Sequence, residues 1–302
     1  MFQLIGLQKN IETVVTLSYK QLLKEKTQDT IGLKRAYRNF LKNIQVADSI
    51  PERDSPKVTF ASELSVINNL IELYKVESAL NDKNQTTVII NQNPEESLEY
   101  ISNNLKKCES EFIKFQTNYP EKSNLFELVI NYIFCAPSNV AGGGSTSNGI
   151  GVIWASPKPN WQSEDFIEFY THEFTHNLVF LDERRYQHYV DYDLILDQDN
   201  FCKSAILCTP RPLDKVFHSL LVATEVLLLR EESLGHPNNP KAHPPSETIL
   251  KNCFDTIYSI ERLQTKSQLL TRRGLELMNL CKEKLNIINN SLSKKELILI
   301  SS

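Results

Sequence analysis

The segment SEDFIEFYTHEFTHNLVFLDERR, residues 163–185, constrains the fold more than any other part of this 302-residue chain. Ser163 suits a helix N-cap, acidic residues follow it, and two arginines end the segment, which is the charge order that a helix dipole favours. The pattern predicts one long helix. Residues four positions apart lie on the same face of a helix, so His172 and His176 are expected side by side, with Glu173 next to them.

His172, Glu173 and His176 form an H-E-x-x-H sequence, which predicts a metal site when it lies on a helix. Two imidazoles need at least one further protein ligand. His218 and Glu225 are the candidates, and both lie on a second predicted helix after Pro212. They are seven residues apart, about 10 Å along the helix axis, so only one of them can reach the same ion. The alternative interpretation is a pair of structural histidines on a partly buried helix.

The rest of the chain predicts a mostly helical α+β protein, in which a small sheet packs beside the H-E-x-x-H helix in a zincin-like arrangement. Helices are expected over residues 9–46, 61–80, 95–115 and, as two or three amphipathic segments, 247–300. Strands are expected over residues 86–91, 128–134 and 150–155. We expect a helical N-terminal region over residues 1–85 and a metal-binding catalytic domain with C-terminal helices over residues 86–302.

Five of the nine glycines lie between Gly142 and Gly151. Because the loop PSNVAGGGSTSNG lacks the residue order of a phosphate-binding loop, we interpret it as a mobile connector or a lid. The strand expected at residues 150–155 is a candidate edge for binding a peptide by strand addition. His188, His236 and His243 lie in or near polar, proline-rich connections, where solvated histidines are expected.

Composition excludes several classes of protein. The chain has 33 basic and 37 acidic residues with a net charge of −4 and no basic block, which argues against a nucleic-acid partner. No apolar run exceeds five residues and the opening MFQLIGLQKN has no secretory pattern, so we expect a cytoplasmic protein without a membrane span. The six cysteines form no C-x-x-C pair and are expected to be buried thiols.

The chain resembles the H-E-x-x-H domain proteins of peptide natural-product (RiPP) biosynthesis clusters. The resemblance is carried by HEFTH at residues 172–176, PRPLDKVFHSLLVA at residues 210–223 and LTRRG at residues 270–274, and it covers about the C-terminal half. Arg272 stands where that family commonly has a proline. Members of the family include iron(II)- and 2-oxoglutarate-dependent peptide β-hydroxylases that act on ribosomally made precursor peptides.

The resemblance implies a dioxygenase whose Fe(II) is held by His172, His176 and His218. Glu173 would then orient a water, a ligand or the precursor peptide. Arg211, expected at the start of the helix that carries His218, would bind the distal carboxylate of 2-oxoglutarate. The main alternative is a zinc metallopeptidase with Glu173 as general base and Glu225 as third ligand. A non-catalytic peptide-binding protein is the third possibility, and the oligomeric state is left open.

Overall fold

The computed structural model describes residues 1–27, 29–45, 55–75, 98–139 and 141–301. The chain forms two compact units. The sheet unit is Leu7–Arg185, and the C-terminal unit is Tyr186–Ser302 together with Met1–Gly6. This division does not coincide with the domain boundary expected between residues 85 and 86, which falls outside the described residues.

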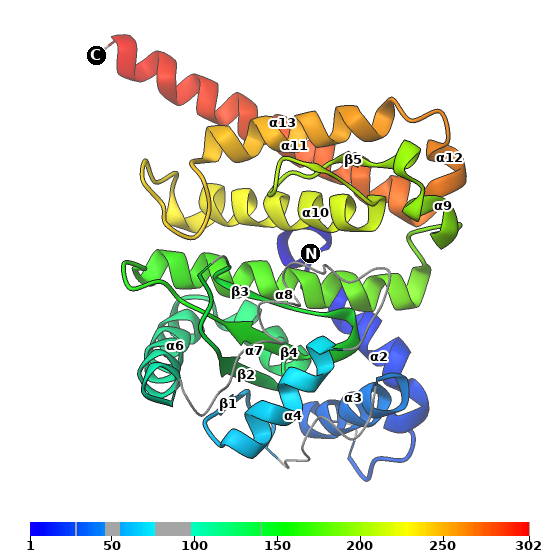
Figure 1. Ribbon diagram of the computed structural model, residues 1–302, viewed down its shortest axis with the longest axis vertical. Coiled ribbons are helices and arrows are strands. Elements are labelled where there is room, and N and C mark those ends of the chain that lie inside the picture. Colours follow the sequence, from blue (N-terminus) through cyan, green and yellow to red (C-terminus); the bar gives the residue numbers. More distant parts are fainter. Residues whose placement is uncertain (28, 46–54, 76–97, 140, 302) are drawn as a thin grey trace. The chain divides into compact units, whose positions relative to one another are not determined.

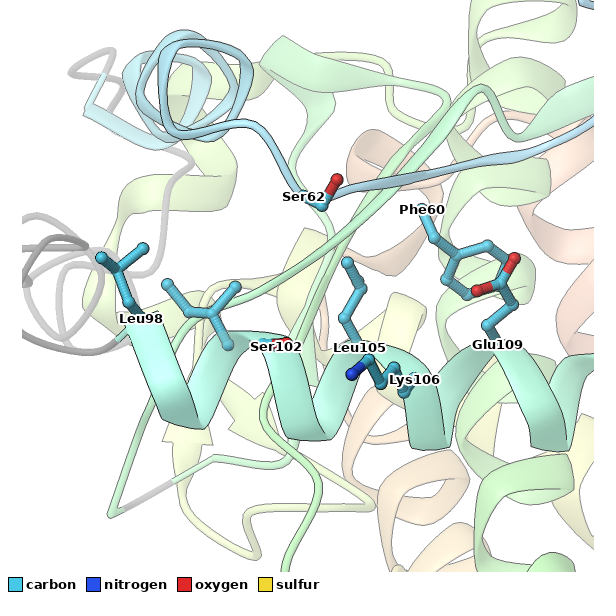
Figure 2. Close-up of a pocket in the computed structure, with 8 residues that line it drawn as sticks. Phe60, Ser62, Leu98, Ser102, Leu105, Lys106 and Glu109 are labelled. Carbon is cyan, nitrogen blue, oxygen red and sulfur yellow. The ribbon is translucent and has the colours of Figure 1, made fainter.

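A four-stranded sheet is the centre of the sheet unit (Figure 1). Its strand order is β1-β2-β4-β3, where β1 (Thr59–Ala61), β2 (Tyr132–Cys135) and β4 (Val152–Ala155) are parallel and β3 (Gly143–Gly144) is antiparallel to β4. Every residue of β2 and β4 is apolar and buried, as expected of parallel strands that are covered on both faces.

Six longer helices complete the sheet unit among the described residues: α2 (Leu7–Leu22), α3 (Thr30–Ile44), α4 (Leu64–Lys75), α6 (Leu98–Asn118), α7 (Pro120–Val129) and α8 (Ser163–Tyr186), of which α8 ends one residue beyond the unit. A short 3-10 turn, Ser147–Gly149, lies between β3 and β4. Helix α8 runs beside the sheet, next to β3 and β4 (Figure 1).

An aromatic cluster holds α8 in place. The rings of Phe112 on α6 and Phe126 on α7 lie 5.0 Å apart, and both contact Tyr170 on α8 at 5.5 and 6.1 Å. The Tyr170 hydroxyl also donates a 2.6 Å hydrogen bond to the carbonyl of Cys108 on α6. Aromatic pairs of this kind add to the free energy gained by burying their area. These contacts therefore stabilise the packing of α8, which carries the H-E-x-x-H sequence, against α6 and α7.

The C-terminal unit is built around α10 (Leu213–Leu229), in which every residue except Lys215 and Leu228 is buried. Helix α10 packs against α1 (Phe2–Ile5), α11 (Ser246–Glu261) and α13 (Arg272–Ser301). A π-helical turn, Arg230–Leu234, continues α10 at its C-terminal end. Short elements complete the unit: α9 (Tyr192–Leu196), the 3-10 turn Gln198–Asn200, the antiparallel pair β5 (Cys202–Lys203) and β6 (Pro210–Arg211), and α12 (Lys266–Leu269).

The fold confirms the expected α+β class, because most described residues are helical and the sheet is small and mixed. The long helix at residue 163, the buried helix after Pro212 and the C-terminal helices are confirmed. All six cysteines are free thiols and five are buried, Cys208 being the exposed one. No described helix is long and apolar enough to cross a membrane.

Several expected elements differ from those observed. The helix expected over residues 9–46 is two helices, α2 and α3, and the strand expected from residue 128 begins at Tyr132 because Pro120 starts a helix that continues to Val129. The prediction of β4 as a peptide-binding edge is wrong, because β4 lies between β2 and β3. The strand expected over residues 86–91 lies outside the described residues.

Candidate functional site

The H-E-x-x-H sequence lies in the middle of α8, and the structure brings its two histidines together as predicted. The ring centroids of His172 and His176 are 5.0 Å apart, with an angle of 58° between the ring planes. Between residues 165 and 182 all side chains are buried except those of His172, His176 and Phe180. These three are spaced by four residues and form one stripe along the helix, so the partly exposed stripe of α8 is the one that carries the two imidazoles.

Glu173 lies beside this stripe and is buried, with 3% of its surface exposed. Its Oε1 is 3.8 Å from Nε2 of His172, and its Oε2 accepts a 2.8 Å hydrogen bond from the Ser145 hydroxyl. Burial raises the pKa of Glu173 to about 8, and the hydrogen bond from Ser145 acts in the opposite direction. A divalent cation at the histidines would lower this pKa, because it would favour the carboxylate.

Ser145 and Asn177 form a hydrogen-bonded chain behind Glu173. The side-chain amide of Asn177 donates to Ser145 Oγ at 3.1 Å and to the Glu173 carbonyl at 2.8 Å, and its Oδ1 accepts from the Gly151 amide at 2.7 Å. Neither residue was predicted from the sequence. Asn177 directly follows the H-E-x-x-H sequence, and a polar residue at that position is a signal from which a supporting role could have been predicted. Ser145 is 28 residues before Glu173, and no short-range pattern points to it.

The described part of the glycine-rich loop is bonded to neighbouring elements of the sheet unit, and its interpretation as a mobile connector or a lid stays a prediction. Gly143 and Gly144 pair with β4, and the Tyr74 hydroxyl donates a 3.0 Å hydrogen bond to the Gly144 carbonyl. A Cβ atom on Gly143 would lie 2.4 Å from both the Phe169 ring and the Trp154 carbonyl. Glycine is therefore required where the loop approaches α8 and β4.

His218 and Glu225 both lie on α10 of the C-terminal unit, and His218 is 7% exposed. Both oxygens of the Glu225 carboxylate already have partners within that unit. Oε1 lies 2.8 Å from the Met1 ammonium group and accepts from the Leu4 amide at 2.8 Å, and Oε2 accepts from the Gln3 amide at 3.1 Å. A carboxylate in this arrangement is a poor candidate for a metal ligand, which weakens the zinc peptidase alternative.

Arg211 was predicted at the start of the helix that carries His218, and this prediction is wrong. It is the second residue of the short strand β6, opposite Cys202, and α10 begins after Pro212. The proline cannot donate to a helix backbone and has an extended ψ of 144°, so it separates strand from helix. Arg211 is half-buried and stays a candidate for carboxylate binding.

The expectation of solvated histidines outside the motif is wrong for two of them. His188 is fully buried, with its ring 6.0 Å from Tyr189 and 5.8 Å from Phe217. His236 bonds Ser246 through Nδ1 at 2.9 Å and Glu231 through Nε2 at 2.7 Å. Composition alone did not distinguish either position from a solvated loop, because His188 is buried against Phe217 of α10 and His236 is bonded by Glu231 and Ser246 only once the connection has folded.

Within either unit, the described residues bring together no group of three or more His, Cys, Asp or Glu side chains that would hold a metal ion. The sheet unit supplies His172 and His176, and the third predicted ligand, His218, belongs to the C-terminal unit. The three-histidine site therefore stays a prediction. No protein-family model and no curated protein matches the chain, so the function proposed below rests on its own residues and on the resemblance described above.

Proposed function

We propose that this protein is an iron(II)- and 2-oxoglutarate-dependent dioxygenase that hydroxylates the β-carbon of a side chain in a ribosomally made precursor peptide in the cytoplasm. The observation that carries the proposal is the pair of adjacent imidazoles on the partly exposed stripe of α8, with a buried carboxyl group beside them. The mixed sheet next to α8 supports a zincin-like arrangement.

The donor set suits iron. Imidazole nitrogens are good ligands for Fe(II), and three protein ligands leave positions for a bidentate keto acid and for dioxygen. His172, His176 and His218 would hold the metal, which when bound supplies the activation of dioxygen together with 2-oxoglutarate. Arg211 would bind the distal carboxylate of the keto acid through a charge-assisted pair of hydrogen bonds.

Glu173 has a distinct role in this proposal. Its Oε2 is engaged by Ser145, and its Oε1 lies on the side of His172. Oε1 is therefore the atom at which Glu173 would hold a water molecule or a polar group of the peptide. Because this contact orients a reactant and does not generate the oxidant, the hydroxylation tolerates changes at Glu173 better than peptide hydrolysis would.

The test is anaerobic reconstitution with Fe(II), followed by 2-oxoglutarate, air and a library of precursor-like peptides. We expect a gain of one oxygen atom in the peptide together with one succinate per turnover, and residual activity in Glu173→Gln. Peptide cleavage without keto acid, abolished in Glu173→Gln, would show a metallopeptidase instead. Tight peptide binding with no mass change under every metal and cosubstrate would show a binding protein.

Metal binding provides a separate test of the ligands. His172→Ala and His176→Ala should each weaken Fe(II) binding by at least about 100-fold, the upper end of the loss seen when a mere supporting residue is removed. His243→Ala, in the proline-rich connection of the C-terminal unit, is the matched control and should bind iron like the wild type. Equal affinity in His172→Ala and His243→Ala, measured anaerobically by equilibrium dialysis, would contradict the proposed site.

A further inference from the structure

We propose that Ser145 is a positioning residue that holds the Glu173 carboxyl group and leaves only Oε1 to act at the motif. The inference rests on the proposed function, because it assigns a role in the reaction at the H-E-x-x-H helix. It concerns a residue that belongs to the glycine-rich loop and that the sequence pattern does not connect to the motif.

The direction of each hydrogen bond in the chain follows from the first one. The Gly151 amide has only a proton to offer, so Asn177 Oδ1 must accept from it at 2.7 Å. This orients the Asn177 side chain, and its amide nitrogen must donate to Ser145 Oγ at 3.1 Å. Ser145 therefore uses an acceptor position toward Asn177. Its single proton has two acceptors within reach, the Glu173 carbonyl at 3.4 Å and Oε2 of Glu173 at 2.8 Å, and the shorter distance assigns it to Oε2.

These hydrogen-bond directions give the two carboxyl oxygens of Glu173 different roles. Oε2 is an acceptor from Ser145 and lies on the loop side, whereas Oε1 lies 3.8 Å from Nε2 of His172. The backbone amide of Gly151 thus orients Asn177, Asn177 orients Ser145, and Ser145 orients the carboxyl group. A rotation of the Glu173 side chain would break the bond to Ser145 in a buried setting, which is costly.

The loop backbone is placed to support this role. The antiparallel pairing of Gly143 with Ala155 and of Gly144 with Trp154 holds the residues directly before Ser145. Tyr74, buried on α4, donates to the carbonyl of Gly144 at 3.0 Å. Ser145 is thus presented to Glu173 by a backbone that is held on two sides, which is the arrangement that keeps a functional group within a narrow range of positions.

A double-mutant cycle of Ser145→Ala and Glu173→Ala tests the contact without any metal. Ser145→Ala should raise the unfolding equilibrium constant by about fivefold in the wild-type background, the usual effect of losing one buried hydrogen bond. The increase should be smaller in Glu173→Ala, where only the bonds of Ser145 to Asn177 and to the backbone carbonyl of residue 173 are left to lose. Ser147→Ala, on the same loop and also partly buried, is the matched control and should show no coupling. Absence of coupling between Ser145 and Glu173 would overturn the inference.

A spectroscopic measurement tests the positioning role. With Co²⁺ alone as the probe, Ser145→Ala should shift the visible absorption bands of the bound ion, because a released carboxyl group changes the surroundings of the metal. Ser145→Thr, which keeps the hydroxyl group, should restore the wild-type spectrum, and Ser147→Ala should not alter it. If the wild type binds Co²⁺ and Ser145→Ala has the same spectrum, the positioning role is wrong and the proposed function stands. If the wild type binds neither Co²⁺ nor Fe²⁺, the proposed function and the role of Ser145 in it both fail, whatever the cycle shows.

Discussion

Glu173 in the sheet unit and Glu225 in the C-terminal unit are both buried, but their carboxyl groups differ in the number of hydrogen-bond and ionic partners. Glu225 on α10 is 0% exposed, and its carboxylate has an ammonium group and two backbone amides as partners. Glu173 on α8 is 3% exposed, and its carboxyl group accepts one hydroxyl hydrogen bond from Ser145.

The comparison separates a structural carboxylate from a functional candidate. Burying a charge costs several kcal/mol unless partners replace the lost water, and the partners of Glu225, which lie at the start of the short helix α1, do so. Glu173 lacks such a set, and burial raises its pKa to about 8. A carboxyl group kept in a costly environment beside two histidines is what a reaction site contains, whereas a saturated carboxylate stabilises the fold.

The largest expected change in unfolding free energy follows from substitution of Glu225. Glu225→Gln removes the negative charge and leaves the Met1 ammonium group buried without an opposite charge, so the C-terminal unit should lose about 3–5 kcal/mol of unfolding free energy. Urea unfolding followed by circular dichroism measures this loss. A change below about 1 kcal/mol would remove the distinction between the two glutamates.

A smaller effect is expected in the pH dependence of the metal-free protein. The folded pKa of Glu173 is above its unfolded value of 4.5, so the folded state binds more protons between these values. The stabilisation by this group is complete below about pH 4.5 and is lost as the pH rises to about 8. Glu173→Gln should flatten this part of the stability curve, measured by thermal unfolding from pH 5 to pH 8. The same slope in wild type and variant would show that Glu173 is not desolvated as described.

The smallest effect is expected for Glu232, which accepts an exposed hydrogen bond of 3.2 Å from the side chain of Gln3. It contacts the same N-terminal segment as Glu225, but from the solvent. Glu232→Gln should change the unfolding free energy by no more than about 0.5 kcal/mol, because water replaces what is lost. This variant is the control for Glu225→Gln, and a comparable loss in both would mean that contact with α1, not burial of charge, decides the effect.

The elements with strong local signals were predictable. Ser163 at the start of the segment, the charges at both ends and the H-E-x-x-H spacing predict α8 and the closeness of His172 and His176, because helix geometry sets which residues are neighbours on one face. The apolar residues of α10 predict its burial for the same reason.

The elements with weak or ambiguous signals were not predictable. Residues 128–134 carry an apolar run that suits a strand, and its first residues belong to α7, because a short apolar run does not distinguish strand from helix. The glycine-rich loop has the composition of a mobile segment, and its pairing with β4 and its bonds to α4 and α8 come from residues far away in the sequence.

Local sequence patterns are enough to predict the motif helix, the two adjacent imidazoles and the α+β class, because these depend on residues within a few turns of one another. Which carboxyl group has a full set of hydrogen-bond and ionic partners depends on tertiary contacts. Glu173 and Glu225 look equivalent as residues on helices, and what distinguishes them is contact with Ser145 in one case and with Met1, Gln3 and Leu4 in the other. Partners that are between 28 and more than 200 residues away leave no trace in local spacing, since only folding brings them within hydrogen-bonding distance.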